Sequence, residues 1–193
     1  MKKSIALISL LAVLMIAFSG CVDNNNPAVN ETGPDAPGSG ANTEEGAAAM
    51  SELENLPAGF EYLASLPLSA DEIRKDYKAE NVSGILGGSE GMYKYSDGSD
   101  FYVDVIECES SSAADDLIFA YKSSFKPLNV GSRFVEESFN GHFAVKITEY
   151  ATIGGDDVPR YSYIWKHENY IFVVFGNSDD SSTVKELAEA TGY

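Results

Sequence analysis

The sequence is poor in basic residues. It has 13 Lys and Arg residues against 30 Asp and Glu residues, which gives a formal net charge of −17. A chain of this charge repels phosphate backbones and anionic lipid head groups, so we expect no nucleic-acid partner. The acidity favours solubility and leaves the fold open.

Cysteine and histidine are also scarce, since the chain has two residues of each kind. His142 and His167, without a CxxC pair, leave a zinc site short of ligands. The acidic loops do not have the spacing of an EF-hand. We therefore expect no metal site and no cofactor.

The chain lacks an apolar run long enough for an ordinary membrane-spanning helix. After Lys2 and Lys3, the residues from Ile5 to Phe18 carry no charge, and Ser9 is the one polar side chain among them. A helix that crosses a bilayer needs about 20 apolar residues. A short apolar run behind a basic start, followed by small residues, is typical of a signal peptide.

The end of this run, Ala17-Phe18-Ser19-Gly20-Cys21, resembles the lipobox of exported lipoprotein precursors of bacteria and archaea. The resemblance implies that residues 1–20 are a signal peptide and that Cys21 carries a lipid. It places the mature chain on the extracytoplasmic side of the cell membrane, where Cys108 would have no disulfide partner within the chain. An ordinary secretion signal and an uncleaved anchor helix remain as alternatives, and both also export the chain.

Residues 21–51 are interpreted as the lipidated cysteine and a disordered tether. The segment is rich in Asn, Gly, Pro, Ala and acidic residues and has few large apolar side chains, so it cannot compensate its ordering entropy by burial. The sequons at Asn30 and Asn81 match the acceptor pattern for N-glycosylation.

Residues 52–193 are predicted to form a single α+β domain. Strand-like runs, tight turns and three capped helical segments predict an antiparallel sheet of about six or seven strands with about three helices, mainly on one face. The local signals include a capping box at Ser69–Glu72, a glycine-rich loop at residues 84–91, a hairpin through Ser96–Ser99 and a tight turn at Asn140-Gly141. The spacing of the apolar residues predicts one core. Its members are Phe101, Val103, Val105, Phe143, Val145, Ile147, Phe172 and Val174, with Leu117, Ile118, Val184 and Leu187 from two helices.

The run Ser138–Tyr150, SFNGHFAVKITEY, together with the Tyr-rich strand, apolar strand and helix that follow, resembles the second half of PsbP-like domains. These include small exported lipoproteins. The resemblance covers about sixty residues and contains no catalytic motif. It supports the α+β expectation, but function does not transfer with fold alone.

Aromatic side chains alternate along residues 160–167. Tyr161, Tyr163, Trp165 and His167 share one face of the predicted strand. This face is either core beneath the helices or an exposed platform for a sugar, a peptide or an apolar ligand.

Gly87-Gly88-Ser89-Glu90-Gly91 matches G-x-S-x-G, but the motif needs a strand before it and a helix after it, and here a strand follows. We therefore expect a membrane-anchored binding or accessory module of the cell envelope, with an envelope protein or a small molecule as partner. A surface structural protein is the alternative, and a hydrolase that uses Ser89 ranks last.

Overall fold

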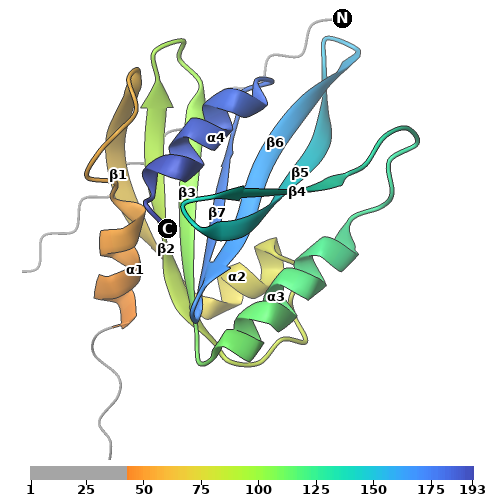
Figure 1. The fold of residues 1–193 in the computed structure, drawn as a ribbon. Coiled ribbons are helices and arrows are strands. Elements are labelled where there is room, and N and C mark those ends of the chain that lie inside the picture. Colours follow the sequence, from red (N-terminus) through yellow and green to blue (C-terminus); the bar gives the residue numbers. More distant parts are fainter. Residues whose placement is uncertain (1–42) are drawn as a thin grey trace, which may run out of the picture. The chain divides into compact units, whose positions relative to one another are not determined.

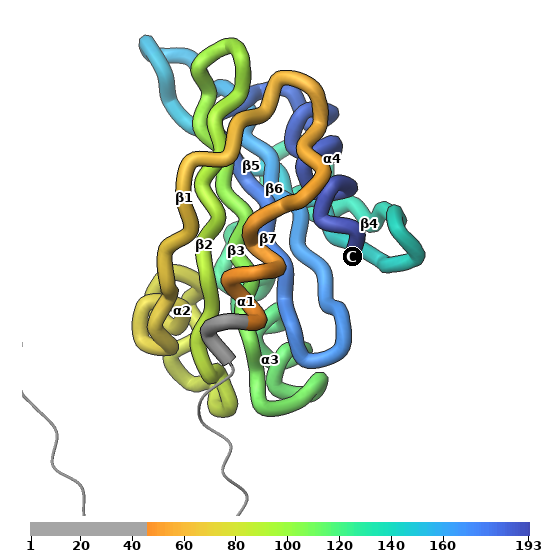
Figure 2. The backbone as a smooth tube through the Cα atoms, turned by 90° about the vertical axis from the view of Figure 1, so that its left-hand side faces the viewer, coloured from red at the N-terminus to blue at the C-terminus, as the bar shows by residue number. Residues whose placement is uncertain are grey.

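The computed structural model describes residues 43–193, which form one antiparallel sheet flanked by helices (Figure 1, Figure 2). The α+β class is as predicted, with seven strands and four helices among the described residues. In chain order the elements are α1 (Thr43–Ser51), β1 (Phe60–Leu68), α2 (Ala70–Asp76), β2 (Ile85–Tyr95), β3 (Asp100–Cys108), α3 (Ser111–Ser124), β4 (Phe134–Phe139), β5 (His142–Ile153), β6 (Asp156–His167), β7 (Tyr170–Gly176) and α4 (Ser181–Ala190).

The strand order β1-β2-β3-β7-β6-β5-β4 places two meanders side by side. Strands β1 to β3 form the first meander and β4 to β7 form the second, and every neighbouring pair is antiparallel. Strands β3 and β7 join the meanders, with Phe101 opposite Gly176 and Glu107 opposite Tyr170. The predicted turn between β4 and β5 is present, because Asn140 takes the positive φ that such a tight turn needs.

Helices cover both faces of the sheet, whereas the sequence predicted them mainly on one. Helices α1 and α4 pack on one face, and α2 and α3 pack on the other. The central strand β3 shows why two covers are needed, because Val103 points to the first face and Ile106 to the second, and both are fully buried. Leaving either face open would expose apolar side chains to water.

The single predicted core is therefore two cores. Phe101, Val103, Val105, Phe172, Val174, Val184 and Leu187 lie in the first, while Leu117 and Ile147 lie in the second with Ile118 and Val145 partly buried against them. Phe143 is 88% exposed, so its placement in the core is wrong. It is the second residue of β5, close to the turn at Asn140-Gly141.

The domain begins earlier than the predicted boundary at residue 52. Residues 43–51 were assigned to the tether, but they form α1, in which Ala47 and Ser51 are fully buried. The helix approaches the sheet closely because Gly91 of β2 has no side chain, and a Cβ there would overlap the Ser51 carbonyl oxygen. Small residues on α1 and on β2 thus bury the helix. A packed helix is usually predicted from large apolar side chains, and α1 has few of them.

Glycines 87, 88 and 91 lie inside β2, not in the loop that the sequence predicted for residues 84–91. A Cβ at Gly88 would overlap the Val105 carbonyl oxygen of the neighbouring strand. These glycines therefore permit close backbone approach within the sheet and under α1.

Candidate ligand-binding pocket

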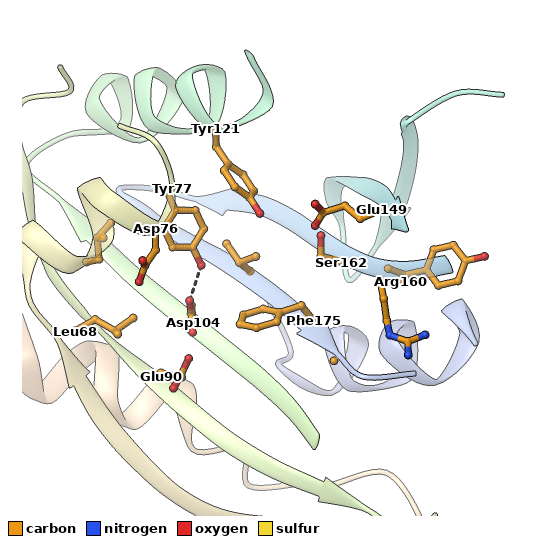
Figure 3. Close-up of a pocket in the computed structure, with 14 residues that line it drawn as sticks. Leu68, Asp76, Tyr77, Glu90, Asp104, Tyr121, Glu149, Arg160, Ser162 and Phe175 are labelled. Atoms are coloured by element: carbon orange, nitrogen blue, oxygen red, sulfur yellow. Dashed lines mark hydrogen bonds between the residues drawn. The ribbon is translucent and has the colours of Figure 1, made fainter. Parts of the chain in front are cut away.

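A pocket of about 360 Å³ opens on the face of the sheet that α2 and α3 cover (Figure 3). Its apolar lining comes from the sheet and from α2, and consists of Leu68, Ile73, Val173 and Phe175. Its acidic side chains are Asp76, Glu90, Asp104 and Glu149. Such a mixture of apolar walls and a few polar groups is typical of sites for small molecules, and the volume lies at the small end of their range.

Helix α2 brings Tyr77 over the pocket. The helix starts at the predicted capping box, in which the Ser69 hydroxyl accepts from the Glu72 amide and the Glu72 carboxylate accepts from the Ser69 amide at 2.9 Å. The helix ends at Asp76, and the next residue, Tyr77, is its C-cap and is 5% exposed. The Tyr77 hydroxyl donates to Asp104 Oδ2 at 2.5 Å.

Two carboxyl groups lie next to each other at this end of the pocket. Glu90 of β2 and Asp104 of β3 are directly opposite in the register, so their side chains leave the sheet side by side. Asp104 is 5% exposed, and its Oδ1 has no hydrogen-bond partner within the described residues. Burial raises the pKa of Asp104 to about 7, and it also raises the pKa of Glu90.

Burial is the largest cause of both shifts, because it destabilises a charged carboxyl group. The Tyr77 hydrogen bond stabilises the ionised form of Asp104, but burial and the charge of Glu90 oppose it. In the ionised state the pair would hold two negative charges with no Lys, Arg or His at salt-bridge distance in residues 43–193. The site therefore holds either a proton or another positive charge.

The opposite end of the pocket is also polar. Ser162 of β6 is 6% exposed, and its hydroxyl lacks a partner among the described residues. Figure 3 shows the Tyr121 hydroxyl from α3 pointing toward Glu149 and Ser162, while the Arg160 guanidinium lies apart from them. Arg160 Nη1 donates to the Pro159 carbonyl at 2.8 Å. Burial raises the pKa of Tyr121, and the charge of Glu149 adds to this effect.

The aromatic face of β6 belongs largely to the core, so the alternative of an exposed platform is wrong for its central residues. Tyr163 and Trp165 are each 1% exposed, beneath α4. The Trp165 ring stacks on the Phe172 ring with centroids 5.3 Å apart. Tyr161 is half-buried and does line the pocket.

The two histidines come together without forming a metal centre. His142 and His167 stand opposite each other on β5 and β6 with ring centroids 5.1 Å apart, and Tyr193 packs on His167. Within residues 43–193 no group of three or more His, Cys, Asp or Glu side chains is placed to hold a metal ion.

Ser89 does not have the geometry of a hydrolase nucleophile. It lies inside β2 and not at a turn between a strand and a helix, and it is 2% exposed beneath α1. Its hydroxyl group bonds with those of Ser51 at 3.0 Å and Ser65 at 2.6 Å, and it donates to the Leu66 carbonyl. A catalytic serine needs a base beside its hydroxyl group, and here Ser51 and Ser65 occupy that place.

The structure describes two of the four remaining residues that the sequence singled out, Asn81 and Cys108. Asn81 is exposed in the turn after α2, as a glycosylation acceptor must be. Cys21 and Asn30 lie outside the described residues. Cys108 is buried, and burial raises the pKa of its thiol to about 11, which makes it unreactive.

Asp104 and Glu90 were not among the site residues predicted from the sequence. A signal was present, because the predicted hairpin through Ser96–Ser99 pairs Lys94 with Asp100. Continuing that register by four residues places Glu90 opposite Asp104. That register would have predicted two carboxyl groups side by side in the sheet.

Comparisons of the chain with protein-family models, with curated proteins and with solved structures found no match. The likeness to PsbP-like domains thus stays a prediction. Among the helices of residues 43–193, none combines the length and the apolar character that crossing a bilayer requires.

Proposed function

We propose that the chain is a lipoprotein anchored through a lipid on Cys21, and that its α+β domain binds a small molecule on the extracytoplasmic side of the cell membrane. The anchor is supported by the lipobox pattern and by the short apolar run that precedes it. In this proposal residues 22–42 connect the lipid anchor to the domain. In this function the domain serves an envelope protein or transporter as an accessory module.

One observation carries the binding function: two residues that line the same pocket each have a buried polar atom without a hydrogen-bond partner among the described residues. These atoms are Asp104 Oδ1 and the Ser162 hydroxyl. A buried polar group without a partner costs about 1–3 kcal/mol, and a protein selected only for stability would pair these atoms or replace them. A ligand that enters the pocket can satisfy both.

A structural protein without a small ligand is the alternative function. It would use the exposed apolar side chains for contacts with other proteins, and Phe119 and Phe143 are exposed. These side chains are single residues on different elements, and scattered exposed apolar residues are normal on a protein surface. The pocket is thus the stronger feature.

A thermal-shift screen with a chemically mixed panel of small molecules tests the binding function. A ligand should raise the melting temperature of the wild-type chain, because it binds the folded state only. Leu68→Trp should abolish the shift by filling the pocket from β1. Leu66→Trp is the matched control, since Leu66 lies two residues earlier on the same strand, is 49% exposed and does not line the pocket.

Two outcomes contradict the binding function. One is that no class of compound stabilises the wild-type chain. The other is that the shift persists in Leu68→Trp, which would locate the ligand elsewhere.

A further inference from the structure

The pocket has an excess of negative charge that its own residues leave uncompensated. It is lined by four acidic side chains and by one basic side chain, Arg160. Arg160 donates to its neighbour's carbonyl, and its guanidinium lies apart from the carboxyl groups in Figure 3. The most buried of these acids, Asp104, lines the pocket, and its Oδ1 has no hydrogen-bond partner within the described residues.

We propose that the pocket binds a small linear organic ammonium ion, whose charged nitrogen lies between the carboxyl groups of Asp104 and Glu90. This inference rests on the proposed binding function and names its ligand class. An ammonium group donates three hydrogen bonds, and here it meets the free Oδ1 of Asp104 and the carboxylate of Glu90. It takes the place of the proton that the pair otherwise holds.

The lining favours an organic cation over a metal ion. Val173 and Phe175 lie beside the acidic pair, and Ile73 and Tyr77 cover it. Calcium and magnesium prefer six or more oxygen ligands, which this apolar surrounding does not supply. The aliphatic part of an amine would contact these side chains. The Tyr77 ring lines the same pocket, where an aromatic face attracts a cation.

The far end of the pocket selects an amine with a second polar group. Ser162 lies across β7 from Asp104 and two residues along, which separates their backbones by roughly 10–12 Å. Ser162 and Glu149 line the pocket there, and Figure 3 shows them close to each other. Acids at both ends fit a linear diamine, with one ammonium group at each end and a methylene chain between.

Calorimetric titration of the full chain in detergent tests this inference, with 1,5-diaminopentane as the probe. The diamine should bind, and n-pentylamine should bind more weakly because it lacks the second ammonium group. Asp104→Asn should weaken diamine binding roughly tenfold or more, since it replaces a charge-assisted hydrogen bond by a neutral one. Glu149→Gln should remove most of the advantage of the diamine over the monoamine.

Glu136→Gln is the matched control, because Glu136 is exposed on β4 and does not line the pocket. It should bind the diamine like the wild type. The uncharged analogue 1,5-pentanediol should not bind.

The inference is overturned if the diamine gives no binding, or if Asp104→Asn and the wild type bind it equally. When the thermal-shift screen finds only neutral or anionic ligands, this inference fails and the binding function stands. When no compound of any class binds, both fail.

Discussion

Replacement of Asp104 by Asn should stabilise the domain at alkaline pH and leave its stability unchanged at acidic pH. The usual pKa of this carboxyl is 3.8, and burial raises it to about 7 in the folded protein. Below pH 3.8 both the folded and the unfolded chain hold the proton, so the carboxyl does not lower the free energy of unfolding. As the pH rises above it, the unfolded chain ionises freely while the folded chain resists, and stability is lost until the pH exceeds the folded value.

The magnitude follows from the same two values. Each tenfold change in proton affinity corresponds to about 1.4 kcal/mol, so the rise from 3.8 to about 7 corresponds to roughly 4 kcal/mol. Asn carries no such cost, keeps the side-chain shape and can still accept from Tyr77. The free energy of unfolding of Asp104→Asn should thus exceed that of the wild type by up to roughly 4 kcal/mol at pH 8, and match it near pH 4.

Urea denaturation between pH 4 and pH 8 measures this difference. The single tryptophan, Trp165, is buried and reports unfolding by fluorescence. Asp156→Asn is the control, because Asp156 is exposed at the start of β6, and its effect should not depend on the pH in this way. A stability difference between Asp104→Asn and the wild type that stays constant across the pH range would refute the reasoning.

The other predictions concern the anchor, the core and α1. Cys21→Ser should prevent lipidation and move the chain from the detergent phase to the aqueous phase in a two-phase extraction; continued partition with the detergent would disprove the lipid anchor. Trp165→Ala should lower the free energy of unfolding by about 3–5 kcal/mol in urea titrations, whereas Phe143→Ser should change it by less than about 0.5 kcal/mol. Equal effects of the two would mean that the register of β5 and β6 is wrong. Gly91→Val should displace α1, seen as faster amide exchange over residues 43–51 with the rest of the sheet still protected; unchanged exchange there would contradict the close packing of α1 on β2.

The sequence predicted most elements because their signals are local. The capping box of α2 and the turn at Asn140-Gly141 each lie within a few residues, and each was found at its predicted place. The alternation along residues 160–167 also placed Tyr163 and Trp165 on one face. It could not decide between core and surface, because that depends on α4, which packs there from a later part of the chain.

The candidate site could not be read in the same way because it joins residues from both meanders. Asp104 and Glu90 follow from a hairpin register, but Val173 and Ser162 come to them through the pairing of β3 with β7. No local sequence pattern predicts the pairing of β3 with β7. Helix α1 was missed for a related reason, since its burial depends on a glycine in β2 and not on its own apolar residues.

The pairing of β3 with β7 also determines when the pocket comes into existence as the chain folds. Each meander can form from local hairpins, but their union must close a long loop between Glu107 and Tyr170, which is the slower and entropically costlier step. Asp104 lies on β3 and Val173 lies on β7, so neither meander forms the pocket alone. A ligand that binds the proposed site would contact strands of both meanders, and it would stabilise their pairing because it binds only the folded domain.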